Sequence, residues 1–88
     1  MKKIANVVEV TGEGLEALLG QQVMLFCSNY IYTGVLEGVN SSFVKLKDAK
    51  IVYETGPFNT KGYKDAQSLP TSEWYVQTQA IESFGPGK

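Results

Sequence analysis

The chain has 88 residues and a formal net charge of −1, a size that fits one domain. Its composition, 43% hydrophobic and 19% charged, is that of a globular domain, and the single cysteine, Cys27, excludes an internal disulfide and favours a reducing, cytoplasmic environment. There is no histidine, no arginine, no dense carboxylate cluster and no Gly-rich phosphate loop. We therefore expect no enzyme, no metal site and no cofactor. No run of about 18 apolar residues occurs, so we expect no membrane-spanning helix.

The N-terminal quarter of the sequence predicts a short helix. Residues 4–10 are rich in β-branched side chains and indicate a short strand or an ordered lead-in. Residues 12–20 predict about two helical turns, because Leu15, Leu18 and Leu19 share one face and Gly20 lies where a helix ends. A helix this short is not stable alone, so we expect its leucine face to pack on a sheet.

Residues 22–54 predict three consecutive strands joined by tight turns. The first spans 22–27 and the second spans 30–39, which is about 33 Å if straight and too long for so small a domain to bury flat. Gly34 and Gly38 lie within the second strand and indicate a sharp bend. The third strand spans 43–54, and a change of hydrophobic phase near Asp48 indicates a bulge or a bend.

The remainder of the chain predicts a long polar connection followed by two short strands. Residues 55–72 are too long for a plain loop and are expected to be partly ordered. The aromatic and basic residues at 58, 61, 63 and 64 either bind a nucleic acid or a protein, or pack as the small cluster of an extended hairpin. Strands are expected over 73–84. Together the pattern predicts a single all-β domain over 1–88, a small, strongly bent, open five-stranded barrel with a short N-terminal helix.

Two segments resemble the Sm/LSm family, whose bacterial branch is Hfq, and the resemblance spans about residues 13–84. The first motif is carried by Val23-Met24-Leu25, by residues 32–40, which read aromatic-x-Gly-x-Leu-x-Gly and end on Asn40, and by Leu46-Lys47-Asp48-Ala49. The second is carried by residues 76–81, where relatives have Arg-Gly or Lys-His before Ala-Ile. The resemblance implies an Sm-like, SH3-like barrel with 22–54 as first-motif strands and 73–84 as second-motif strands.

The resemblance also implies a ring, in which the last two strands of neighbouring protomers join edge to edge. Independently, the unpaired edges of an open barrel favour pairing, and head-to-tail pairing that closes gives a cyclic assembly. We expect a homo-oligomer of about five to seven protomers. The expected interface residues are Trp74, Tyr75, Val76, Ile81 and Phe84. Trp74 and Tyr75 alternatively cap the barrel.

The function that the resemblance implies is binding of single-stranded RNA, U-rich or A-rich, at the pore face and without catalysis. The candidate RNA-binding residues are Asn40, Ser42, Phe43, Gln77, Thr78 and Gln79. By Hfq-like spacing the stacking position falls on Ser42, with Phe43 one residue later, and the basic residues of the relatives are replaced by Gln77-Thr78-Gln79. Lys45 and Lys47 either contact phosphate or keep the strand soluble.

Structural alternatives stay open for these residues. Asn40 is also an ordinary turn residue, Phe43 an ordinary core residue, and Gln77 and Gln79 ordinary solvent-facing residues. Two other functions stay open as well. One is a ring that serves as a structural or protein-binding platform without significant RNA affinity, and the other is a monomeric SH3-like barrel that binds peptide. We expect no membrane partner.

Overall fold

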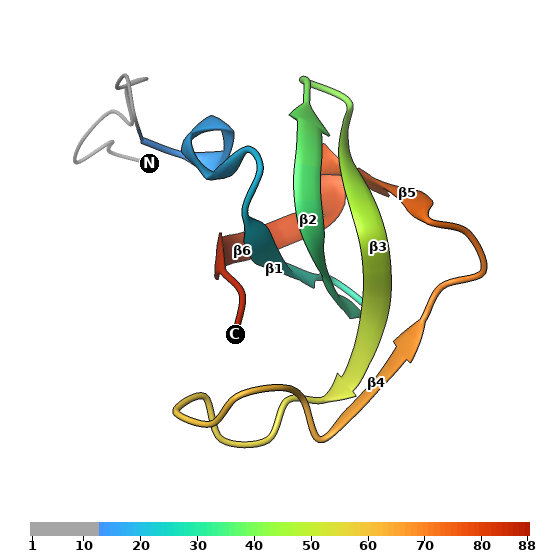
Figure 1. Ribbon diagram of the computed structural model, residues 1–88. Coiled ribbons are helices and arrows are strands. Elements are labelled where there is room, and N and C mark those ends of the chain that lie inside the picture. The colour runs from blue at the N-terminus through green and yellow to red at the C-terminus, as the bar shows by residue number, and fades with distance from the viewer. Residues whose placement is uncertain (1–12) are drawn as a thin grey trace, which may run out of the picture.

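The computed structural model describes residues 13–88, and the strand or lead-in expected at 4–10 lies outside the described residues. Within 13–88 the chain forms one strongly curved antiparallel sheet of six strands that does not close on itself (Figure 1). The elements in chain order are η1 (Leu15–Leu18), β1 (Gln22–Cys27), β2 (Ile31–Val39), β3 (Phe43–Glu54), β4 (Asp65–Ser68), β5 (Glu73–Gln77), η2 (Thr78–Ala80) and β6 (Ile81–Pro86). The strand order is β4-β3-β2-β1-β6, and β5 pairs with β3.

The pairing of β2 with β3 is irregular near Gly34. Thr33 pairs with Lys50 and Val35 pairs with Lys47, so Gly34 faces two residues of β3, Asp48 and Ala49. This two-against-one arrangement is a β-bulge, and Asp48 has the left-handed backbone conformation, with φ of 52°. The bulge near Asp48 that the hydrophobic phase indicates is therefore present, and the inward-facing residues change from Val44 and Leu46 to Ala49.

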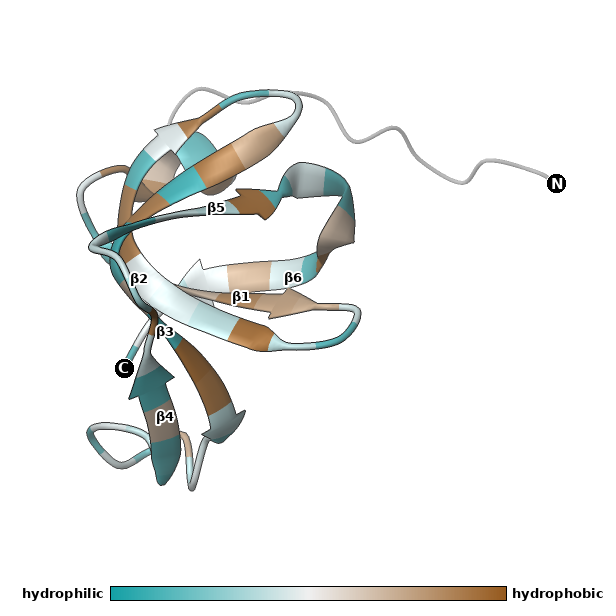
Figure 2. Ribbon diagram, turned by 90° about the vertical axis from the view of Figure 1, so that its right-hand side faces the viewer, coloured by the Kyte–Doolittle hydropathy of each residue, from teal (hydrophilic) through white to brown (hydrophobic). Residues whose placement is uncertain are grey.

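The core fills the concave side of the curved sheet. Its central side chains come from β1, β2, β3 and β5 and are fully or almost fully buried: Val23, Leu25, Leu36, Val44, Leu46, Ala49 and Val76. Hydrophobic segments of β1 and β5 lie on opposite sides of this concave face (Figure 2). Because β5 continues through η2 into β6, which pairs with β1, the chain wraps around its core while the sheet stays open.

The predicted helix over 12–20 is too long. Within residues 13–20 only Leu15–Leu18 are helical, as the four-residue 3₁₀ helix η1, because Leu19 is already extended and Gly20 donates a backbone hydrogen bond of 2.8 Å to the carbonyl of Leu36. The chain thus enters pairing with β2 before a second turn forms. Leu15 and Leu18 pack against the core as expected, whereas Leu19 is exposed. No helix within residues 13–88 is long and apolar enough to cross a membrane.

The long connection is partly ordered, as the sequence predicts, and it forms an extended hairpin with the end of β3, one of the two interpretations of this segment. β4 pairs with the second half of β3, from Lys50 to Glu54, so residues 13–88 contain six strands where five were expected. β4 and β5 therefore lie one after the other along the same edge of β3. The tip of the connection, around residues 56–63, extends away from the rest of the sheet (Figure 1).

Candidate binding surface

The two segments that carry the candidate RNA-binding residues meet in the structure. The side-chain oxygen of Asn40 accepts hydrogen bonds from the backbone amides of Ser42, at 2.7 Å, and Phe43, at 2.9 Å, which fixes the turn between β2 and β3. Thr78, at the start of η2, donates its backbone amide to the carbonyl of Ser42, at 3.0 Å, and its hydroxyl to the carbonyl of Asn40, at 3.2 Å. Asn40 therefore has the turn role, and the turn is tied to η2.

An exposed aromatic pair lies beside this junction. Phe43 and Tyr75 contact each other edge to face with ring centroids 5.3 Å apart, and they are 41% and 54% exposed. The alternative in which Phe43 is a core residue is therefore wrong. Gln77, which pairs with Phe43, and Gln79 are also exposed. The surface thus offers aromatic faces together with amide donors and acceptors, a combination that suits unpaired bases.

The charge on this surface is weak. Lys45 pairs across the strands with Tyr75, and its ammonium forms an ion pair of 3.4 Å with Glu73. The hydrogen bond and the negative charge of Glu73 raise the pKa of Lys45, so the lysine stays protonated but its charge is balanced by a neighbour. Lys47 is exposed on the same strand. Phosphate attraction at this surface therefore rests on few unbalanced cations.

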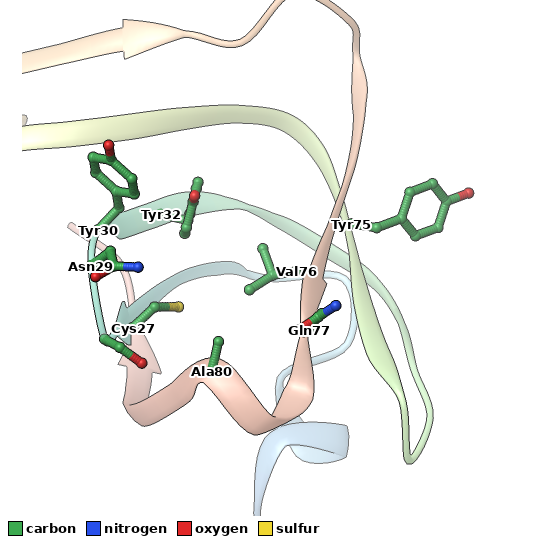
Figure 3. Close-up of a pocket in the computed structure, with 9 residues that line it drawn as sticks. Cys27, Asn29, Tyr30, Tyr32, Tyr75, Val76, Gln77 and Ala80 are labelled. Atoms are coloured by element: carbon green, nitrogen blue, oxygen red, sulfur yellow. The ribbon is translucent and has the colours of Figure 1, made fainter.

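A pocket of about 250 Å³ lies near this surface, between the β1–β2 turn and the β5–η2 segment (Figure 3). One side is formed by Cys27, Tyr30 and Tyr32, and the other includes Val76 and Ala80. The side chain of Tyr75 points away from it (Figure 3). The sequence analysis missed the two tyrosines, although their spacing in an apolar strand was a visible signal.

The pocket is chemically neutral. Burial, and to a smaller degree the charge of Glu82, raises the pKa of the Cys27 thiol, and burial is also the main cause that raises the pKa of the Tyr32 hydroxyl. Both groups are therefore protonated at neutral pH. This lining suits an uncharged, partly aromatic group better than an ion.

The expected interface residues divide into two groups. Val76 belongs to the core, and Trp74 and Ile81 are partly buried against it. Val76 therefore offers a neighbouring strand only its backbone, while its side chain forms part of the pocket wall. Tyr75 on β5 and Phe84 on β6, which is 44% exposed, present large apolar side chains to solvent. The interface itself stays a prediction.

No residues in the described part of the chain gather into a metal site, since no group of three or more potential ligands occurs there. Comparison with known proteins found no family model that matches the chain and no match among curated proteins. The resemblance to the Sm/LSm family thus stays an interpretation of the motifs, and the function has to be argued from the geometry above.

Proposed function

We propose that this chain is an Sm-like protein that assembles head to tail into a closed ring and binds single-stranded RNA, without catalysis, at the surface formed by the Asn40 turn and the Gln77–Gln79 segment. In this proposal the curved sheet is an open barrel of the Sm type. Five to seven protomers, roughly, close the ring. The single cysteine favours the cytoplasm as its location.

The observation that carries the proposal is the free edges of β5 and β6, which together with β4 are the three strands in residues 13–88 that pair on one side only. Among the described residues, β5 pairs only with β3 and β6 pairs only with β1, so each has one edge without a partner strand. Unpaired edges bearing exposed apolar side chains such as Tyr75 and Phe84 favour strand addition. Because the two edges are different surfaces, their pairing is heterologous, and a heterologous contact that closes produces a ring.

RNA binding is supported by the chemistry next to the free β5 edge. Phe43 and Tyr75 offer faces for base stacking, and the exposed amides of Gln77 and Gln79 offer hydrogen bonds to base edges. In a ring these groups recur once per protomer, so contacts that are weak singly combine through avidity. Affinity is therefore modest, with a shallow dependence on salt.

One observation favours a second candidate function, a ring that acts as a structural or protein-binding platform. Glu73 balances the charge of Lys45, which pairs across the strands with Tyr75, and the side-chain oxygen of Asn40 is already used inside its turn. Without unbalanced charge, the exposed aromatic pair also suits a protein partner.

Fluorescence anisotropy with labelled oligo-U and oligo-A at low salt separates the two functions. We expect binding of at least one oligonucleotide. Phe43→Ala and Gln77→Ala should each lower the affinity by roughly fivefold or more, because each removes a base contact. Phe58→Ala is the matched control, since Phe58 is an exposed aromatic residue of the distant β3–β4 connection. Undetectable binding of both oligonucleotides, or an equal loss in all three variants, would favour the platform function.

A further inference from the structure

The side-chain ammonium of Lys88 lies within the connection between β3 and β4. Its Nζ donates hydrogen bonds to the backbone carbonyls of Thr55, at 2.6 Å, and Pro57, at 2.7 Å. The same nitrogen lies 5.4 Å from the ring centroid of Phe58 and 5.2 Å from that of Tyr63. Two carbonyl acceptors and two aromatic rings around one nitrogen are the chemistry that recognises a primary ammonium.

One wall of this site is anchored to the core. The hydroxyl of Tyr63 donates a hydrogen bond of 3.2 Å to the hydroxyl of Thr33 and accepts one of 3.4 Å from the backbone amide of Lys88. Thr33 is buried, and its own hydroxyl donates to the carbonyl of Val23 at 2.8 Å. Because its hydroxyl is held by the sheet, the ring of Tyr63 is positioned before any ammonium binds.

The other walls are held by the loop itself. Thr60 donates both its backbone amide, at 3.2 Å, and its hydroxyl, at 2.8 Å, to the carbonyl of Pro57, which the Lys88 ammonium also contacts. Gly56 has a φ of 69°, a conformation that favours glycine and turns the chain between the two carbonyls. Phe58 is 64% exposed, so the site opens to solvent on that side.

We propose that residues 55–63 form a binding site for a primary alkylammonium group, occupied in this structure by Lys88, and that a lysine side chain of a partner polypeptide takes the same place when Lys88 leaves it. The site accounts for the aromatic residues of the connection, which the proposed RNA-binding function does not use. Lys88 is held on the same chain, so its high effective concentration lets an external ammonium compete only poorly.

The two carbonyl contacts make the site selective among ammonium groups. A primary ammonium has three N–H donors and satisfies both carbonyls, whereas a trimethylammonium has none and retains only the contact with the rings. An uncharged chain of the same length retains neither. The order of affinity is therefore primary ammonium, then trimethylammonium, then the neutral analogue.

The test uses the full chain carrying Lys88→Met, which keeps an unbranched apolar stem and removes the charge. The ring resonances of Phe58 and Tyr63 are followed by NMR during titration with Nα-acetyl-lysine N-methylamide. We expect saturable shifts, with affinity roughly tenfold or more above that for the unaltered chain, where Lys88 competes. Phe58→Ala added to Lys88→Met is the matched control and weakens binding. The Nε-trimethyl analogue binds more weakly, and the norleucine analogue does not shift the rings.

A measurement on the unaltered chain covers the case in which Lys88→Met does not fold. The Cε protons of Lys88 are expected to be displaced upfield by the ring currents of Phe58 and Tyr63, and Phe58→Ala reduces that displacement. Lys88 protons at their free-chain positions would overturn the proposal. So would a folded Lys88→Met chain without saturable shifts, or one that binds the norleucine analogue equally well. None of these outcomes depends on ring formation or RNA.

Discussion

At Gly34 the backbone of β2 lies so close to the bulge of β3 that a side chain would be tightly packed. A Cβ atom at this position would lie 3.1 Å from the carbonyl oxygen of Lys47 and 3.2 Å from the Cα of Ala49. Backbone atoms within a paired strand cannot move aside cheaply. The close approach of β2 to the bulge of β3 therefore favours a glycine here.

Gly34→Ala is expected to lower the free energy of unfolding by about 1–3 kcal/mol, because the added methyl group overpacks this close approach. Gly38→Ala is the matched control in the same strand, since its Cβ would meet only the Cβ of Lys45 at an ordinary 3.8 Å. Urea unfolding of both variants measures the difference. Equal losses at the two positions would mean that close approach is not the reason for Gly34.

Ionisation of Cys27 is expected to make the fold less stable at alkaline pH. Burial raises the pKa of Cys27 in the folded chain above that of a free thiol. The protonated thiol therefore contributes its full stabilisation at pH values below those at which a free thiol ionises, and this contribution is lost as the pH rises through the folded pKa. Above about pH 8.5 the unaltered chain should lose stability more steeply than Cys27→Ala. Urea unfolding from pH 7 to 10 measures both slopes, and parallel slopes would contradict the assignment. The raised pKa of Tyr32 has the same sign, and its main cause, burial, acts in both chains, whereas the smaller contribution from the charge of Cys27 is absent in Cys27→Ala.

At the scale of the element, β5 has two faces with different tasks. Trp74, opposite Leu46, packs against the core, and the next residue, Tyr75, points away from it. Alternation along an edge strand thus places one aromatic residue where it stabilises the protomer and its neighbour where it is available to a partner.

Trp74→Ala is expected to cost about 2–4 kcal/mol of unfolding free energy, less than the roughly 3–5 kcal/mol typical of a fully buried large aromatic residue, because the indole is only partly buried. Tyr75→Ala should cost the protomer less than about 1 kcal/mol. It should instead raise the protein concentration at which the assembly dissociates. Chemical unfolding and sedimentation at several concentrations separate the two effects, and a Trp74→Ala chain of unaltered stability would show that the indole contributes no packing.

The sequence predicts best those elements in which the pattern of hydrophobic side chains shows which residues face the core. β3 has the predicted bounds, and its bulge appears in the hydrophobic phase, because both depend on which residues face the core. β4 has no such signal, since Asp65–Ser68 is polar and is held by backbone pairing with β3. The helix at 12–20 was overestimated because the periodicity of leucines does not reveal that Gly20 already pairs with Leu36.

The candidate site follows the same logic. The turn role of Asn40 is local and was among the interpretations of the sequence, and the approach of the Gln77–Gln79 segment was expected from the resemblance. The site around Lys88 was beyond sequence analysis, because its two hydrogen bonds go to backbone carbonyls more than thirty residues away.

At the scale of the whole molecule, the balance of charges decides how strongly the proposed surface attracts RNA. Glu73→Gln should free the charge of Lys45, strengthen oligonucleotide binding at low salt and steepen the salt dependence by up to about one unit of slope. Glu54→Gln is the matched control, because it breaks the comparable ion pair with Lys64 in the distant hairpin. An equal gain in both variants would indicate a general effect of net charge and would argue against Lys45 as an RNA contact.

Because β5 and β6 have free edges, the proposed function depends on assembly into a ring. The mass of the intact particle tests that assembly most directly. Native mass spectrometry of the full chain at micromolar concentration is expected to show one dominant closed species of about five to seven protomers. A closed ring leaves no free edge to which further protomers could add, so larger assemblies are not expected. Oligo-U or oligo-A should add its mass to that species without changing the number of protomers. A monomer at micromolar concentration would contradict both ring functions and favour a small barrel that binds peptide.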